Sequence, residues 1–141
     1  MAVTRIKIAR LLVTVPAVFL AVVPPLVDLN ATHALNPLWP GHARLHSVWL
    51  LATTSLIALV ALGVLWRDFE ASSVRRGALL VGTPLLGFFV AALTRSAYGG
   101  AFTDPNGVPF RFGPLDANLA VFGLWAVFIA IAMLLVRRSG D

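Results

Sequence analysis

The chain has 141 residues, of which 59% are hydrophobic and 12% charged, and its formal net charge is +5. This balance is not that of a soluble globular domain, and a hydrocarbon core about 30 Å thick needs roughly 20 apolar residues per helix, so the length accommodates about four membrane spans and no separate soluble domain. Cysteine is absent, which excludes disulfide bonds, thiolate metal sites and paired-thiol redox chemistry.

The first two apolar runs, residues 11–27 and 42–66, are each long enough to cross a bilayer as an α-helix. The pair Pro24-Pro25 should kink or end the first helix near its far side. A basic start before such a run is also typical of a signal peptide, but the cleavage pattern is poor and we expect a retained helix. The second helix should begin near Pro37 or Pro40, because proline is favoured in a first helical turn.

The third and fourth apolar runs, residues 78–95 and 117–136, complete the set of spans. Pro84 in the third run, with Gly82 and Gly87 beside it, predicts a kink or a close helix contact, because small residues let helix backbones approach each other in lipid. The sequence therefore predicts an all-α membrane protein, a four-transmembrane-helix bundle with two longer loops on one side.

Basic residues near span ends are retained on the cytoplasmic side of a membrane. They precede the first span, lie between the second and third, and follow the fourth: Arg5, Lys7, Arg10, Arg67, Arg75, Arg76, Arg137 and Arg138. We therefore expect one integral domain, residues 1–141, with both termini cytoplasmic and the two longer loops, residues 28–47 and 94–116, non-cytoplasmic. Richness in Arg, Ala, Val and Leu points to a bacterial inner membrane. Because the basic residues flank hydrophobic runs and form no patch, we expect no nucleic-acid partner.

All three histidines of the chain, His33, His42 and His46, fall in the first non-cytoplasmic loop and the start of the second helix. His42 and His46 are four residues apart, so they should share one helical face, with Trp49 one turn further along nearly the same face. Two imidazoles on one face can share a metal ion, a proton or a substrate. Arg44 should point to another side of the helix.

The second non-cytoplasmic loop is rich in turn-forming pairs. The Asn106-Gly107 pair predicts a short hairpin of residues 101–103 against residues 108–112, lying over the bundle as a lid. This loop would bring Arg95, Tyr98 and Asp116 to the membrane face that carries the histidines.

The predicted topology gathers the histidines, Asp28 and Asp116 at the non-cytoplasmic membrane face and leaves no ionisable side chain in the middle of the spans. Ion pumps and proton-coupled transporters place such groups in the bilayer interior, so an interfacial pocket is favoured over a transmembrane path. The candidate catalytic residues are Asp28, His33, His42, His46 and Asp116. The candidate substrate-binding residues are Asn36, Trp39, Arg44, Trp49, Arg95 and Tyr98.

Three functions fit this set of residues. The favoured one is acid/base chemistry of the isomerase or cyclase type on a lipophilic small molecule or lipid, because imidazole and carboxyl groups suit proton transfer. The second is a single divalent metal ion, zinc or iron, held by His33, His42 and His46 with a carboxylate, so the cofactor is either none or one metal. The third is a non-catalytic structural or partner-binding protein. Abundant Gly and Ala also allow a homo-oligomer.

The segment from Asp28 to His46 reads D-L-N-A-T-H-A-L-N-P-L-W-P-G-H-A-R-L-H. It resembles the signature of an uncharacterised family of small four-span membrane proteins from fungi and bacteria. In that signature an acidic residue precedes Thr-His, followed by Asn-Pro-x-Trp-Pro and then His-Ala-Arg-x-His. Gly41 departs from the pattern, in which a second proline is common. The resemblance implies a four-span fold and implies no activity.

Overall fold

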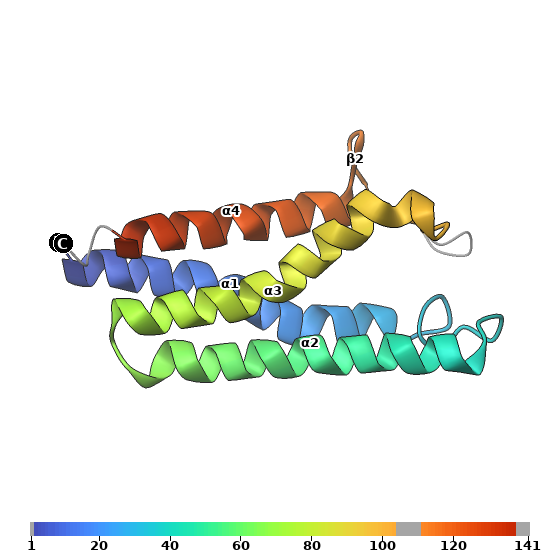
Figure 1. Ribbon diagram of the computed structural model, residues 1–141, viewed down its shortest axis with the longest axis horizontal. Coiled ribbons are helices and arrows are strands. Elements are labelled where there is room, and N and C mark those ends of the chain that lie inside the picture. The colour runs from blue at the N-terminus through green and yellow to red at the C-terminus, as the bar shows by residue number, and fades with distance from the viewer. Residues whose placement is uncertain (1, 104–110, 138–141) are drawn as a thin grey trace.

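The structure, a computed structural model, describes residues 2–103 and 111–137 and consists mainly of four helices (Figure 1). These are α1 (Ala2–Asp28), α2 (Gly41–Arg67), α3 (Ala71–Thr94) and α4 (Ala117–Arg137). A short 3-10 helix, η1 (Arg95–Ala97), follows α3, and two short strands, β1 (Arg111–Phe112) and β2 (Leu115–Asp116), precede α4. All four long helices are long and apolar enough to cross a membrane. The predicted fold class, an all-α membrane bundle, is therefore confirmed.

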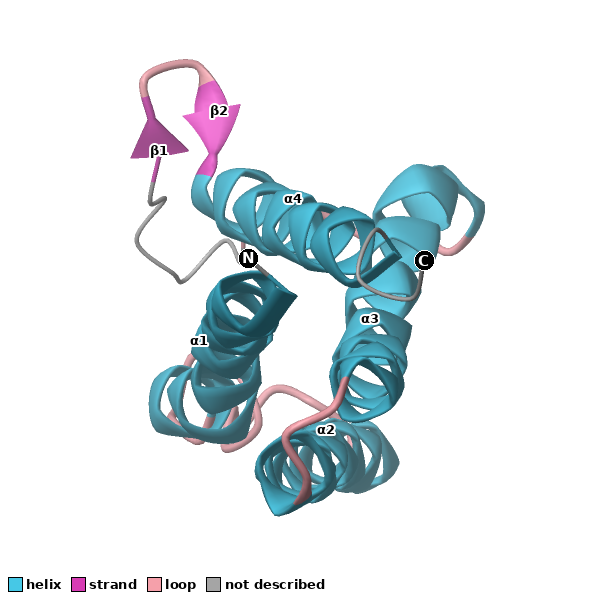
Figure 2. Cartoon of the chain, turned by 90° about the vertical axis from the view of Figure 1, so that its left-hand side faces the viewer, coloured by secondary structure: helices cyan, strands magenta, loops and turns pink. Residues whose placement is uncertain are grey.

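The four helices form a ring when the bundle is viewed along its length (Figure 2). Each helix contacts the next one in the chain, α4 contacts α1, and α1 also contacts α3. Among the four long helices, as far as the structure describes them, α2 and α4 are the one pair that makes no contact. As predicted, α2 begins directly after Pro40, at Gly41.

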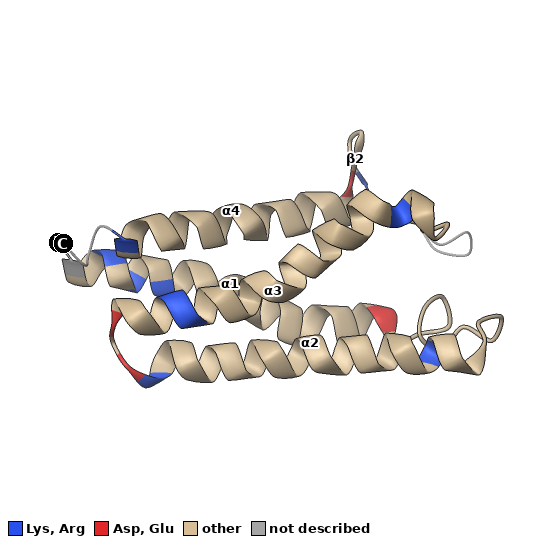
Figure 3. Cartoon of the chain, in the orientation of Figure 1, with Lys and Arg blue, Asp and Glu red and all other residues tan. Residues whose placement is uncertain are grey.

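The charged residues mark the two ends of the bundle (Figure 3). One end, here the basic end, combines the start of α1, the α2–α3 connection and the end of α4. It carries Arg5, Lys7, Arg10, Arg67, Arg75, Arg76 and Arg137. The opposite end, the loop end, is formed by residues 28–40, 95–103 and 111–116. All of the candidate site residues except Trp49 lie at the loop end or in the first two turns of α2, which starts there.

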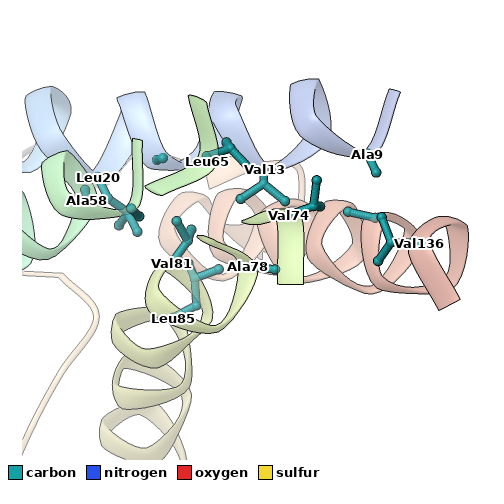
Figure 4. Packing of buried hydrophobic residues seen from close by; sticks show 13 residues of the cluster. Ala9, Val13, Leu20, Ala58, Leu65, Val74, Ala78, Val81, Leu85 and Val136 are labelled. Carbon is teal, nitrogen blue, oxygen red and sulfur yellow. The ribbon is translucent and has the colours of Figure 1, made fainter. Parts of the chain in front are cut away.

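The tightly packed core, shown in Figure 4, extends from the basic end to just past the middle of the bundle. Small residues and branched aliphatic residues from all four helices make up this cluster, which lets the helix backbones approach one another closely in lipid. Its fully or nearly fully buried members are Ala9, Val13, Ala17, Leu20, Ala58, Ala61, Leu65, Val74, Ala78, Val81, Leu85, Ala132 and Val136. Most of its members lie nearer the basic end, so the helices are packed more tightly there than toward the loop end.

The direction of α3 changes in its middle, near Pro84, which lacks the backbone N–H that an unbroken helix would use (Figure 1). Beyond this bend α3 leaves α2 and runs toward the start of α4. A Cβ atom added at Gly82 or Gly87 would meet no atom within 4 Å, so these glycines do not permit a close helix contact. The sequence pattern therefore predicted the kink correctly, while the close contact is made elsewhere, by Gly77 against Leu65.

A buried arginine ties α1 to the α2–α3 connection. Arg10 is 6% exposed, and its guanidinium lies 5.0 Å from the ring centroid of Trp66 and 4.7 Å from that of Phe69. The same group donates a hydrogen bond to the carbonyl oxygen of Asp68. Trp66 Nε1 donates to Thr14 Oγ1 at 3.1 Å, which adds a second link between α1 and α2. Cation–π contacts shielded from water contribute up to about 2 kcal/mol. The sequence pattern indicated only that Arg10 marks the cytoplasmic end of the first membrane span.

The hairpin forms at a different position from the predicted one. Arg111 pairs with Asp116 and Phe112 with Leu115, across a turn that contains Gly113 and Pro114. Gly113 has φ +61°, a conformation that glycine adopts without strain. Residues 101–103 form no strand, and residues 108–110 of the predicted hairpin lie outside the described residues. The turn of this observed hairpin lies directly before the start of α4.

Candidate functional site

The connection between α1 and α2, residues 29–40, is a compact series of turns stabilised by its own polar groups. Asn36 is 3% exposed, and its side-chain oxygen accepts the backbone N–H of Leu38 at 3.0 Å. The backbone N–H of Ala34 donates to the carbonyl of Asp28 at 2.9 Å, which folds the loop back onto the end of α1. Asn36 was predicted to bind substrate, but in the structure it is buried and holds this turn.

Asp28 and His33 form an acid/base pair at the end of α1. The Nε2 atom of His33 lies 4.0 Å from Oδ1 of Asp28, and the two side chains are 43% and 36% exposed. A proton on Nε2 would therefore face the carboxylate, and the pair would become an ion pair. Both groups remain reachable from outside the protein.

The hydrogen bonds around Thr32 fix which nitrogen of His33 carries hydrogen. Asn30 donates through Nδ2 to the carbonyl of Val27 at 2.7 Å, and its Oδ1 accepts the backbone N–H of Thr32 at 2.8 Å, so its amide can have one orientation only. The Thr32 hydroxyl lies 2.7 Å from the same Oδ1 and must donate to it, because that oxygen has no hydrogen.

The remaining contact of the Thr32 hydroxyl decides the tautomer of the imidazole. Thr32 Oγ1 lies 2.8 Å from Nδ1 of His33. Since its single hydrogen points to Asn30, this oxygen accepts, and Nδ1 of His33 donates. In the neutral ring the other nitrogen, Nε2, then has a free lone pair and faces Asp28. The result is a base that already has the tautomer needed to accept a proton.

His42 and His46 form a second pair, in the first two turns of α2. Their Nε2 atoms are 3.0 Å apart, and the ring centroids lie 4.4 Å apart with an interplanar angle of 87°. The ring of Trp49 lies against His46 at a centroid distance of 5.7 Å. The predicted shared helical face is thus present in the structure. All three side chains are exposed, so this face points away from the bundle.

The three histidines are not combined into one metal site in the structure. Across residues 2–103 and 111–137, no three His, Asp or Glu side chains lie close enough together to hold a metal ion. His33 bonds to Thr32 and faces Asp28, whereas His42 and His46 contact each other. The structure thus does not bring the three histidines of the predicted ligand set together, because the turns of residues 29–40 direct His33 back toward α1.

Asp116 does not join the histidines, although the sequence placed it in the same pocket. It belongs to β2, which contacts α4 and β1 and no other described helix or strand. Its Oδ1 accepts the backbone N–H groups of Asn118 at 2.9 Å and Leu119 at 3.4 Å. Asp116 therefore caps the start of α4, where aspartate satisfies N–H groups that have no partner within the helix.

The two candidate residues that follow α3 bond to α3 itself. Arg95 donates to the carbonyl of Ala92 at 2.7 Å, with its guanidinium 4.9 Å from the ring centroid of Phe102. The hydroxyl of Tyr98 donates to the carbonyl of Ala91 at 2.7 Å. The segment η1 contacts α3 and no other described helix or strand, so these side chains close the end of α3. They were predicted to bind substrate beside the histidines, and the structure does not bring them there.

The two remaining candidates, Trp39 and Arg44, do stay near the histidines in the chain. Trp39 is half-buried in the turn before α2, where its backbone N–H donates to the carbonyl of Asn36 at 3.2 Å. Arg44 is exposed, and its backbone N–H donates to the carbonyl of Pro40 in the first turn of α2. Their side chains make no interaction that ties them to either histidine pair within the described chain.

A surface groove lies elsewhere in the described chain, between α3 and α4. It has a volume of about 280 Å³ and no ionisable lining residue, being formed by Ala78, Leu79, Gly82, Thr83, Leu86, Ile129 and Met133. Acid/base chemistry has no group to use there. The chemically able residues remain at the α1–α2 connection and the start of α2.

A model of a protein family of unknown function, DUF6640, matches residues 12–138. The chain belongs to this family. The matched residues include the Asp28–His33 and His42–His46 pairs and reach into all four helices. Comparisons with curated proteins and with solved structures gave no match.

The sequence patterns did not identify Asn30 and Thr32 of this DUF6640 chain as candidate site residues. The pattern Asn-x-Thr directly before a histidine was the available signal, because asparagine and threonine side chains bond readily to neighbouring backbone groups in turns. They orient the imidazole of His33 and are positioning residues.

Proposed function

We propose that this protein is a membrane-embedded enzyme that moves protons on a lipophilic small molecule, in a reaction of the isomerase or cyclase type. His33 acts as the base, and Asp28 balances the charge of the imidazolium that forms. The single observation that supports this assignment is the hydrogen-bond chain from Asn30 through Thr32 to His33, which leaves Nε2 free beside Asp28.

An isomerisation needs no partner beyond these two groups. Nε2 of His33 takes a proton from one atom of the substrate, and the electron pair left behind shifts the double bond. The imidazolium then returns its proton to a second atom, so the enzyme ends in its starting state. A base positioned in this way contributes about 10² to 10⁴-fold to a rate.

The surroundings of the Asp28–His33 pair suit a substrate that arrives through the bilayer. Large apolar side chains of the same connection are exposed, with Leu29 at 46%, Leu35 at 57% and Leu38 at 79%. In a membrane protein such side chains contact lipid or a lipid-like ligand. The separation of α3 from α2 beyond Pro84 leaves this end of the bundle less tightly packed than the basic end (Figure 1).

The orientation that we propose sets both termini in the cytoplasm of a bacterial inner membrane, with the loop end on the other side. It is supported by the basic residues at the basic end, since such residues stay in the cytoplasm. A green fluorescent protein fused after Asp141, which fluoresces in the cytoplasm and not after export, is expected to be bright. A dark, fully produced fusion would reverse this orientation.

The segment from Asp28 to His46 is proposed as the functional signature of the family.

The function is tested by comparing lipid extracts of cells that produce the natural protein or His33→Ala with extracts of cells that lack it. We expect one or more lipophilic compounds to change in mass-spectrometric or chromatographic profile with the natural protein, and the change to disappear with His33→Ala. Equal membrane amounts of both proteins are the control. Identical changes with both proteins would overturn the assignment of His33, and no change with either would favour a non-catalytic role.

A further inference from the structure

The proposed proton transfer does not use the His42–His46 pair, and the geometry of this pair indicates a separate chemical role. Both side chains are exposed on the outer face of α2, on the same stripe as Trp49, Leu56 and Val60. The stripe continues into the apolar part of the helix, so the two imidazoles lie where the membrane surface meets water. A small ion in the water layer can therefore reach them.

The distance between the two nitrogens fits a hydrogen bond between the rings and fits a chelated metal ion equally well. Zinc lies about 2.0–2.1 Å from an imidazole nitrogen, so two such nitrogens bound to one ion at an angle of about 90–110° are about 2.9–3.4 Å apart. The two Nε2 atoms are 3.0 Å apart. The contact of Trp49 with the His46 ring restricts one of the two side chains and so lowers the entropy lost on binding.

We propose that His42 and His46 chelate one divalent transition-metal ion, such as Zn²⁺, with water in the remaining positions. Neutral imidazole is a good ligand for zinc, copper and nickel and a poor one for magnesium or calcium, which prefer oxygen. The site involves neither His33 nor Asp28 and does not depend on the proposed enzymatic function.

One effect opposes this site and is too small to prevent binding. The N-terminal end of a helix carries a partial positive charge, which lowers the affinity for a nearby cation by about 2- to 5-fold. This is smaller than the roughly 10²-fold that a second linked ligand adds to the affinity.

The proposal is tested by titrating ZnCl₂ into the protein in phosphatidylcholine nanodiscs and recording the heat by calorimetry. We expect one Zn²⁺ per chain. Loss of one of two linked ligands weakens such binding by about 10²-fold, so His42→Ala and His46→Ala should each raise the dissociation constant by that factor. MgCl₂ should give no binding heat.

The matched control is His33→Ala, which removes an imidazole of the same connection and should leave the zinc affinity unchanged. Helical circular dichroism verifies that all variants are folded, as expected for exposed side chains. Absence of zinc binding by the natural protein, or an equal loss in all three variants, would overturn the metal site. Neither result bears on the lipid profiles that test His33 as a base, so the two proposals fail separately.

Discussion

Replacing Asp28 by asparagine is expected to lower the turnover of the lipophilic substrate by about 10²-fold or more. Asparagine keeps the shape of the side chain and removes its negative charge, so the imidazolium of His33 loses the carboxylate 4.0 Å away. The conversion found in the comparison of lipid extracts serves as the assay, measured as a rate with purified protein in nanodiscs.

The matched control for this change is Asp116→Asn. Asparagine caps a helix start about as well as aspartate, and Asp116 lies in β2, outside the Asp28–His33 pair. We expect natural turnover from this variant. An Asp28→Asn protein with unchanged turnover would show that the carboxylate has no part in the reaction.

Thr32 should act on the reaction through the tautomer of His33. Thr32→Val removes the hydroxyl that accepts hydrogen from Nδ1, so the hydrogen becomes free to move to Nε2. We expect turnover to fall and the ¹⁵N chemical shifts of labelled His33 to change toward the Nε2–H form. A fall in turnover with unchanged shifts would contradict the positioning role and leave only a structural one.

Replacing Gly77 by leucine is expected to destabilise the bundle by about 3 kcal/mol, near the upper end of the usual cost of overpacking a core. A Cβ atom at Gly77 would already lie 3.2 Å from Cδ1 of Leu65 and 3.6 Å from the carbonyl oxygen of Ala61. A full leucine side chain must push α3 away from α2 at their closest approach. Thermal or denaturant unfolding in detergent micelles, followed by circular dichroism, measures the change.

Gly82→Leu on the same helix is the matched control. No atom lies within 4 Å of the position of its Cβ, and the side chain would project into the apolar groove between α3 and α4. We expect stability within about 0.5 kcal/mol of the natural protein, as for other uncrowded sites. Equal destabilisation by the two variants would mean that the contact of Gly77 with Leu65 does not limit helix packing.

The structure separates the part that confers stability from the part that carries the candidate chemistry. Most of the buried cluster and the contacts of Arg10 with Trp66 and Phe69 lie nearer the basic end, while the Asp28–His33 and His42–His46 pairs lie toward the loop end. Variants of the loop end should therefore change binding and catalysis with little effect on folding, which makes the experiments on His33, His42 and Asp28 interpretable.

Much of this arrangement was present in local sequence patterns. The lengths of the apolar runs predict four spans, because the thickness of a bilayer sets the length of a helix that crosses it. Pro40 predicts the start of α2, and the four-residue spacing of His42 and His46 predicts their contact, because neighbours on a helix are fixed by its pitch. These inferences involve residues close in the chain, where geometry follows directly from the sequence.

The relations between distant segments depended on the tertiary structure. Sequence topology brought Asp116 to the same membrane face as the histidines, but only packing shows that β2 contacts α4 and not α2. Likewise Pro84 predicts a bend in α3, whereas only the tertiary structure shows that the bend carries α3 away from α2 (Figure 1). The sequence by itself determined the spans and the local histidine geometry, because bilayer thickness and helix pitch are fixed. Packing of side chains far apart in the chain decided which of those residues share a site.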